Sequence, residues 1–194
     1  MLFGSGNIFA QSDGDGSSGD PYLISNLADL QWLSNSANSA QWASGKYFEQ
    51  TADIDAAGAT PAITPIGNGT TQFSGNYDGG YFTIDNLTIS GGTADYQGLF
   101  GYTLNSTIQN VVLTNVNISG ASYVGGLVGY AQGMTSSSIT SCGVSGTVTG
   151  TTNNVGGLIG SINGSVLTVS TCWSSADATA GGQAAGGLIG FCRR

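Results

Sequence analysis

Hydrophobic residues recur along this chain in short, evenly spaced groups rather than in long runs. The clearest group is a leucine and a second apolar residue between two glycines, which occurs at 98–101, 126–129, 157–160 and 187–190. The first glycines of these groups are separated by 28, 31 and 30 residues. A period of this length is typical of stacked repeat architectures. The pattern therefore predicts successive coils of short strands.

Each repeat contains one arm of fixed length and one of variable length. Val111, Cys142 and Cys172 each lie 15 residues before the first glycine of the next group. Their distance from the preceding group varies, which indicates aligned strands on one side and turns that tolerate insertions on the other. We expect any displayed function on the variable side, at 102–110, 130–141 and 161–171.

The Gly-Leu-x-Gly groups are interpreted as structural. Each leucine should point inward and stack on its equivalents, while the glycines allow positive φ and close approach of the neighbouring backbone. A phosphate-binding loop is not supported, because no G-x-x-x-x-G-K-[ST] motif occurs and no helical pattern follows the glycines. The predicted structural core comprises Gly98, Leu99, Gly101, Gly126, Leu127, Gly129, Gly157, Leu158, Gly160, Gly187, Leu188 and Gly190.

A single helix is predicted ahead of the repeats, after a short strand at 21–24. Ser25 or Asn26 can cap a helix that runs to about Ser36, with Leu27, Leu30 and Leu33 forming a narrow apolar stripe. Such a helix would cover the open end of the first coil. A helix that binds a partner is the alternative.

Strand signals continue after Lys46. Alternation from Phe82 to Ile89 slips by one residue at Asp85–Asn86, which predicts a bend between two strands. The fold class is therefore all-β: a parallel β-helix, expected to be right-handed, with an N-terminal capping helix. Further strand candidates lie at 47–51, 52–54, 62–63 and 65–67.

Three segments are predicted: a truncated signal or leader with a flexible entry at 1–19, the strand and capping helix at 20–45, and the solenoid at 46–194. The first 11 residues are similar to the end of a secretory signal but lack a basic region, so an ordinary N-terminus is the alternative. The fourth glycine group is followed only by 191–194. We expect a fragment whose uncapped last coil can associate end to end with another copy.

Composition narrows the possible functions. The net charge is −8 and Lys46 is the only basic residue before the last two positions, which argues against nucleic acid binding. The chain has no histidine, so it cannot carry an HExxH metallopeptidase motif. No apolar run approaches the length of a membrane span. We expect no cofactor and no insertion into a membrane.

Tyrosines gather near the glycine groups and the turns. Tyr102, Tyr123 and Tyr130 are the candidate binding residues, and Tyr81 and Tyr96 belong to the same set. Such side chains can contact glycans or proteins without catalysis. Packing at the corners of the coils is the alternative interpretation.

Two other functions remain open. A polysaccharide-active β-helix needs paired carboxylates; Asp53 with Asp55, and Asp78 with Asp85, are the internal acidic pairs, and solvated turn aspartates are the favoured interpretation. Ice binding needs a regular T-x-T ladder, whereas the threonines look scattered: Thr147, Thr149, Thr151 and Thr152.

Three cysteines cannot all pair within one chain. Cys142 and Cys172 share a register, so either a disulfide or a ladder of buried free thiols is possible. The free thiols are favoured, because in-register parallel strands point both Cβ atoms the same way. Cys192 has no equivalent in the other repeats.

The repeats resemble GLUG motifs, named for their Gly-Leu-any-Gly core. Upstream segments follow the order found ahead of such repeats, including Pro21-Tyr22-Leu23-Ile24, Gly45-Lys46-Tyr47-Phe48 and Pro65-Ile66-Gly67. The resemblance covers about residues 20–191. It implies a secreted or surface-anchored parallel β-helix in a bacterial adhesin, or near an immunoglobulin A peptidase. Since the residues that catalysis needs are also lacking, we expect non-catalytic attachment to a glycan or protein on a host or neighbouring cell.

Overall fold

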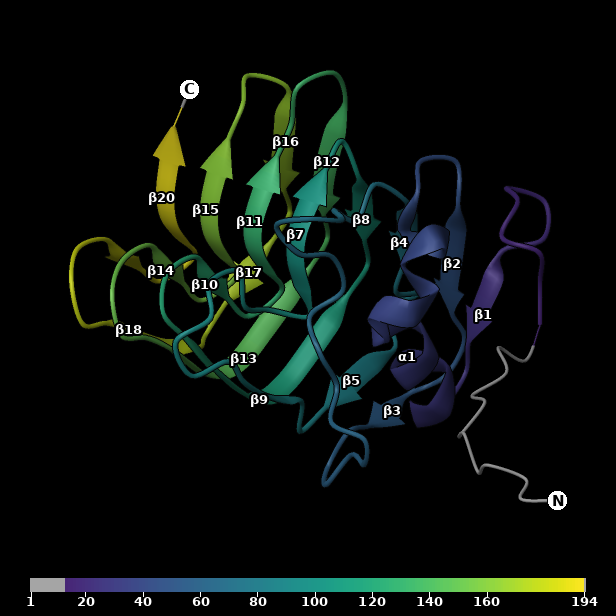
Figure 1. Cartoon of the computed structure of the whole chain (residues 1–194), viewed down its shortest axis with the longest axis horizontal. Helices are drawn as coiled ribbons and strands as arrows, with labels where there is room; N and C mark the ends of the chain where they lie inside the picture. The colour runs from purple at the N-terminus through teal and green to yellow at the C-terminus, as the bar shows by residue number, and fades with distance from the viewer. Residues whose placement is uncertain (1–12, 194) are drawn as a thin grey trace, which may run out of the picture.

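The computed structural model describes residues 13–193, so the possible signal remnant at 1–11 lies outside the described residues. The chain forms a parallel β-solenoid of about six turns (Figure 1). The six-stranded sheet contains one strand from each turn. The handedness of the solenoid stays a prediction.

Four sheets form the walls, and all the pairings between their strands are parallel within residues 13–193. The six-stranded sheet consists of β1 (Tyr22–Ile24), β2 (Tyr47–Gln50), β4 (Asn76–Asp78), β8 (Thr107–Gln109), β12 (Ser137–Thr140) and β16 (Leu167–Ser170). The seven-stranded sheet consists of β3 (Ile54–Asp55), β5 (Thr83–Asp85), β6 (Thr88–Ser90), β9 (Val112–Gly120), β13 (Gly143–Gly150), β17 (Trp173–Ser174) and β18 (Asp177–Ala180). The four-stranded sheet consists of β7 (Phe100–Leu104), β11 (Val128–Gln132), β15 (Ile159–Asn163) and β20 (Ile189–Arg193). The three-stranded sheet consists of β10 (Val124–Gly125), β14 (Val155–Gly156) and β19 (Ala185–Gly186).

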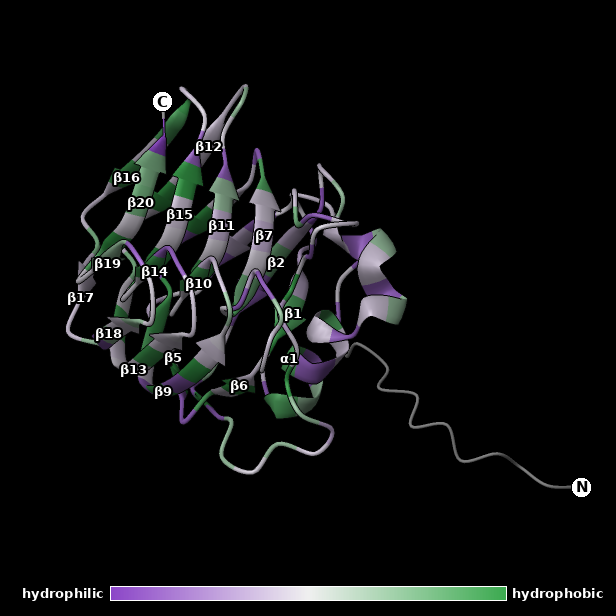
Figure 2. Cartoon of the chain, turned by 60° about the vertical axis from the view of Figure 1, so that its left-hand side comes forward, coloured by the Kyte–Doolittle hydropathy of each residue, from purple (hydrophilic) through white to green (hydrophobic). Residues whose placement is uncertain are grey.

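The core is a stack of equivalent side chains. Leu99, Leu127 and Leu158 are fully buried, as predicted, and Leu188 in the last coil is half-buried against them. Figure 2 shows apolar positions recurring from coil to coil along the stacked strands. This repetition lets each coil bury apolar surface only against its neighbours.

The motif glycines are required by close approach between coils. A Cβ on Gly126 would lie 2.5 Å from the carbonyl oxygen of Gly157, and one on Gly129 would lie 2.7 Å from that of Gly101. The prediction that these glycines adopt positive φ is wrong, because none of the motif glycines does so. The backbone turns instead at residues just before the motif, such as Tyr123 with φ 57° and Asn154 with φ 61°.

The predicted register of the fixed arm is confirmed. Gly143 pairs with both Val112 and Trp173, so Val111, Cys142 and Cys172 occupy equivalent positions.

The variable arm is confined to one turn, between the four-stranded and six-stranded sheets. Between the strand positions that pair in register, the chain has two residues in one coil (105–106), five in the next (133–137) and four in the third (164–167). These differences account for the uneven period of the motif.

Helix α1 (Leu27–Ser34) covers the β1 end of the solenoid (Figure 1). Its N-cap is Asn26, whose side chain accepts hydrogen bonds from the backbone amides of Ala28 and Asp29. Leu30 and Leu33 are fully buried in the core, which confirms the predicted capping role.

Three features of the N-terminal region differ from expectation. The helix ends at Ser34 and continues as the 3₁₀-helix η1 (Ser36–Trp42). The strand candidates at 62–63 and 65–67 are not strands, and Ile66 forms only an isolated bridge to Phe100. Residues 13–20 are hydrogen-bonded to the solenoid, with Leu23 N–H donating to Asp13 and Tyr47 N–H to Gly16.

The bend predicted at Asp85–Asn86 is confirmed. Asn86 has φ 56° and separates β5 from β6. The predicted segments 20–45 and 46–194 share one sheet, because β1 pairs with β2. The division into segments stays a prediction.

Candidate functional site

Four tyrosines meet on the outside of the solenoid, and we call them the tyrosine patch: Tyr96, Tyr102, Tyr123 and Tyr130. The rings of Tyr96 and Tyr123 are stacked, with centroids 5.2 Å apart and planes 9° apart. Those of Tyr102 and Tyr130 meet edge-on with centroids 4.8 Å apart. Contacts between the two pairs close the cluster. Each such aromatic pair contributes about 0.5–1.5 kcal/mol beyond the area it buries.

The register between coils brings these side chains together. Tyr102 on β7 pairs directly with Tyr130 on β11, and both point outward between buried residues. Tyr96 and Tyr123 precede the bridge between Gln97 and Val124, which places them on adjacent coils.

Tyr96 and Tyr123 both adopt the left-handed conformation, with φ 61° and 57°. This conformation is uncommon for aromatic residues and costs of order 1–3 kcal/mol at each position. Asn154 and Ala184 hold the equivalent position in the next two coils and share this conformation, so it is a feature of the repeat. The strain here positions both rings beside the strands that carry Tyr102 and Tyr130.

Amide side chains border the rings. The hydroxyl of Tyr102 donates to Gln132 Oε1 at 2.7 Å, and Asn163 Nδ2 donates to the hydroxyl of Tyr130 at 2.7 Å. Partial burial raises the pKa of Tyr96 and of Tyr102, and neighbouring tyrosines raise both further. The hydroxyl groups of Tyr96 and Tyr102 therefore stay protonated at physiological pH. A small depression of about 90 Å³ adjoins Tyr123, Tyr130 and Asn163.

The structure brings together four of the five candidate tyrosines: Tyr96, Tyr102, Tyr123 and Tyr130. Tyr81 lies elsewhere, with 65% of its surface exposed. The four patch residues are half-buried and pack on one another. The two interpretations, packing at a coil corner and display on the surface, therefore apply to the same residues.

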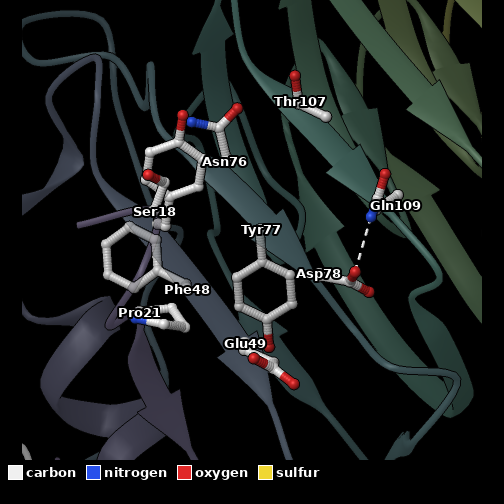
Figure 3. Close-up of a pocket in the computed structure, with 10 residues that line it drawn as sticks. Ser18, Pro21, Phe48, Glu49, Asn76, Tyr77, Asp78, Thr107 and Gln109 are labelled. Atoms are coloured by element: carbon white, nitrogen blue, oxygen red, sulfur yellow. Dashed lines mark hydrogen bonds between the residues drawn. The ribbon is translucent and has the colours of Figure 1, made fainter. Parts of the chain in front are cut away.

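A groove of about 320 Å³ lies on the outer face of the six-stranded sheet, over β2, β4 and β8 (Figure 3). Glu49, Asp78 and Gln109 form one row across it, because they pair in register. Gln109 Nε2 donates to Asp78 Oδ2 at 2.6 Å, drawn as the dashed line in Figure 3. The sequence does not predict the pairing of Glu49 with Asp78, since no glycine motif marks the register of these coils.

Asp78 is poorly suited to act as a general acid. Partial burial alone would raise its pKa, but hydrogen bonds from the Gly80 amide, Gln109 and Asn110 outweigh burial and lower it. The acid of a glycosidase needs a raised pKa. The row in the groove therefore resembles a polar binding surface more than a catalytic pair.

Asp53 and Asp55 are engaged with the next coil. Asp53 Oδ1 accepts from the backbone amide and hydroxyl of Thr83, and Asp55 Oδ1 accepts from Asn86 Nδ2 at 3.0 Å. These bonds lower the pKa of both carboxyl groups. Their position fits the interpretation as turn aspartates.

Asp85 has the same role one coil further on. It accepts hydrogen bonds from Thr114 Oγ1 at 2.6 Å and from Asn115 Nδ2 at 2.8 Å, which lower its pKa. Asp85 and Asp78, which the sequence suggests as a carboxylate pair, do not form one site. Each carboxylate accepts hydrogen bonds from different residues. The internal aspartates thus form ladders that join neighbouring coils.

The threonines of the repeats are more regular than the sequence indicates. One row of hydroxyl side chains crosses four coils of the seven-stranded sheet, through the pairings of β6, β9, β13 and β18. A parallel row two residues earlier along each strand is interrupted by Asn117 and Asp177. The first row consists of Ser90, Ser119, Thr149 and Thr179.

Residues 13–193 contain no group of three or more histidine, cysteine or acidic side chains placed to hold a metal ion. None of the helices in this range is long and apolar enough to cross a membrane.

Comparison with known proteins identifies the repeat. Residues 120–149 match the family model described as the GLUG motif. The chain carries a GLUG motif. This match confirms the resemblance seen in the sequence, and the motif includes Gly126, Leu127 and Gly129.

Two sequence relatives match almost two thirds of this chain. The chain is 38% identical over 126 residues to halomucin from Haloquadratum walsbyi, a match that covers 63% of this chain and 1% of halomucin. It is 30% identical over 136 residues to a protein from Evansella cellulosilytica provisionally described as a Gly-rich membrane protein, covering 66% of this chain and 15% of that one. The chain thus spans only a small part of these relatives. Neither relative is named as an enzyme.

One solved structure shares the fold. A Bacteroides ovatus protein, provisionally described as an immunoglobulin A1 protease, superposes on 93% of this chain with a TM-score of 0.67 and 20% identity. The match covers 64% of that chain. At this identity the likeness concerns the fold, and it confirms the parallel β-helix.

Proposed function

We propose that this chain is a non-catalytic, extracellular β-solenoid module that binds surface glycans through the tyrosine patch. The observation that carries the proposal is the convergence of Tyr96, Tyr102, Tyr123 and Tyr130 into one outward-facing cluster. Placement at the cell surface is supported by the names of the sequence relatives. The adhesin role implied by the GLUG resemblance is part of this proposal.

The chemistry of the patch suits a carbohydrate. A sugar presents apolar C–H faces and hydroxyl groups, and tyrosine rings offer apolar faces with polar edges. Gln132 and Asn163 add amide groups beside the rings. Because neighbouring rings and these amides already hold the tyrosines in place, binding needs little further ordering.

The absence of catalysis is supported by the aspartates. Asp53, Asp55, Asp78 and Asp85 have lowered pKa values and accept hydrogen bonds from the next coil. Polysaccharide hydrolysis by the chain would contradict this part of the proposal. An assay for newly formed reducing ends tests it, and turnover that is lost in Asp53→Asn would establish the enzymatic alternative.

A glycan array tests binding. We expect the wild-type chain to bind a subset of surface glycans, and Tyr102→Ala/Tyr130→Ala to lose most of that signal. Tyr81→Ala is the matched control, because Tyr81 is exposed and lies outside the patch. Equal binding by the double variant and the wild type would refute the role of the patch.

Ice binding is the second candidate, favoured by the hydroxyl row along β6, β9, β13 and β18. Regular hydroxyl spacing on a flat sheet face can order water at about 4.8 Å intervals between strands. Thermal hysteresis that is lost in Thr149→Lys and retained in Tyr102→Ala would favour this candidate over glycan binding.

A further inference from the structure

Two cysteines lie next to each other on neighbouring coils. The pairing of Gly143 with Trp173 places Cys142 beside Cys172, and the backbone amide of Cys142 donates to Cys172 Sγ at 3.4 Å. Parallel strands hold such Cα atoms about 4.8 Å apart, inside the range of about 4.4–6.8 Å that a disulfide permits. Both thiols are free. A bond between them would need no change of register.

The two thiols have different environments. Cys142 is fully buried, and its pKa is raised by the hydrogen bond with the Cys172 side chain and by burial. Cys172 is half-buried. The hydrogen bond with the Cys142 side chain lowers the pKa of Cys172 to about 6, together with backbone hydrogen bonds and against the effect of partial burial.

The groups around the pair carry no charge. The sulfur atoms contact backbone carbonyls of Ile108, Ile139, Thr140 and Ser170, and outside the pair no charged side chain of the described chain shifts either pKa. The accessible member of the pair is therefore the better nucleophile near neutral pH, and the buried member keeps its proton.

We propose that Cys172 and Cys142 form a reversible thiol–disulfide site that reacts with low-molecular-weight disulfides. The Cys172 thiolate attacks one sulfur of the small disulfide, which gives a mixed disulfide and releases one small thiolate. Cys142 then loses its proton, attacks the Cys172 sulfur and releases the second small thiolate. Overall, two protein thiols and one small disulfide become one protein disulfide and two small thiols.

The bond is reversible for a geometric reason. In-register parallel strands point both Cβ atoms in the same direction, which strains a disulfide and makes it easier to reduce. The cysteine pair shares no residue with the tyrosine patch, so its test is independent of glycan binding. The disulfide would join two adjacent coils covalently under oxidising conditions and would be reduced when thiols are abundant.

The test uses the full chain with Cys192→Ser, which leaves only the pair. The reduced protein is mixed with oxidised glutathione at pH 7, and its mass is measured after acid quenching. We expect the loss of two hydrogens and recovery of the original mass with excess reduced glutathione. A lasting glutathione adduct would overturn the proposal, as would a reaction that occurs only in denaturant.

Cys142→Val in the Cys192→Ser background separates the first attack, by Cys172, from the second attack, by Cys142. Val111 occupies the equivalent position in the preceding coil, so valine fits this row of the core. We expect this variant to stop at the mixed disulfide. The pH midpoint for alkylation of Cys172 should lie below the ordinary value of about 8.5 with Cys142 present and move toward that value without it. An unchanged midpoint in a variant with wild-type circular dichroism would show that Cys142 does not activate Cys172.

Discussion

Replacing the first glycine of a GLUG motif by alanine tests why the motif contains glycine. In Gly126→Ala the new Cβ would lie 2.5 Å from the carbonyl oxygen of Gly157 and 2.5 Å from Val144 Cγ1. Cβ contacts below 3.0 Å do not occur, so the coils must separate locally by roughly half an ångström. The oxygen belongs to the backbone and is itself an acceptor for the Gly126 amide. Rotamer changes therefore cannot relieve the clash.

The expected loss follows from two opposing effects. Overpacking of a well-packed interior costs about 1–3 kcal/mol, while replacing glycine by alanine gains about 0.4–1 kcal/mol by restricting the unfolded chain. We expect a net loss of about 1–2 kcal/mol in the free energy of unfolding, which lowers Tm by roughly 2–8 °C for a chain of this size. Urea and thermal unfolding followed by circular dichroism measure both quantities.

Gly187→Ala is the matched control. Gly187 holds the same motif position in the last coil, and a Cβ there meets no atom within 4 Å. Its φ is not in the positive range either. We expect no loss, and a gain of up to about 1 kcal/mol. Equal effects of the two substitutions would refute the argument from close approach.

Three further predictions concern stability. The pKa of Asp85 is lower in the folded chain than in the unfolded chain, where it is about 3.9. Asp85 therefore adds to the free energy of unfolding above that pH, and this stabilisation is lost as the pH falls through the folded pKa. Asp85→Asn should therefore lower the urea midpoint at pH 7 and differ less from the wild type at pH 3; a constant difference would contradict this. Leu127→Ala should lower the free energy of unfolding by about 2–5 kcal/mol. Leu188→Ala should lower it clearly less, because Leu188 is only half-buried. Equal losses in urea unfolding would disprove the stacked core. Asn26→Ala should cost about 0.5–2 kcal/mol through loss of the helix cap, whereas Asn26→Ser should restore most of it; no change in Tm would argue against the cap.

The repeating part of the fold was predictable from the sequence. Leucine and glycine recur every 28 to 31 residues, and the equivalent positions of Val111, Cys142 and Cys172 predict the register that the structure shows. The cap at Asn26 and the bend at Asn86 also followed from local residue preferences. Such features depend on neighbouring residues or on a repeated motif.

The N-terminal coils were harder to predict, because they lack the glycine motif. Ile66 is buried without belonging to a strand, since the segment around it contains prolines and glycines that form no continuous ladder. The row of Glu49, Asp78 and Gln109 depends on a register that no motif marks. The sequence favours positive φ at the motif glycines, whereas in the structure Tyr96 and Tyr123 adopt it.

The candidate site was predicted only in part. Tyr102, Tyr123 and Tyr130 were identified by their position near the motif, but their contact depends on ring orientations that the sequence does not specify. Tyr96 joins them because its left-handed backbone turns the ring onto that of Tyr123. Tyr81 shares this backbone conformation but lies in the connection between β4 and β5, so conformation alone does not define the patch.

Titration of the chain with its strongest array glycan, observed by NMR of ring-labelled tyrosines, tests the central proposal most directly. The chain has eight tyrosines, four of which form the patch. The proposal predicts that the ring signals of Tyr96, Tyr102, Tyr123 and Tyr130 shift together and saturate with one dissociation constant. Shifts confined to Tyr47, which lines the groove over β2, or no shift of any tyrosine at saturation, would contradict it.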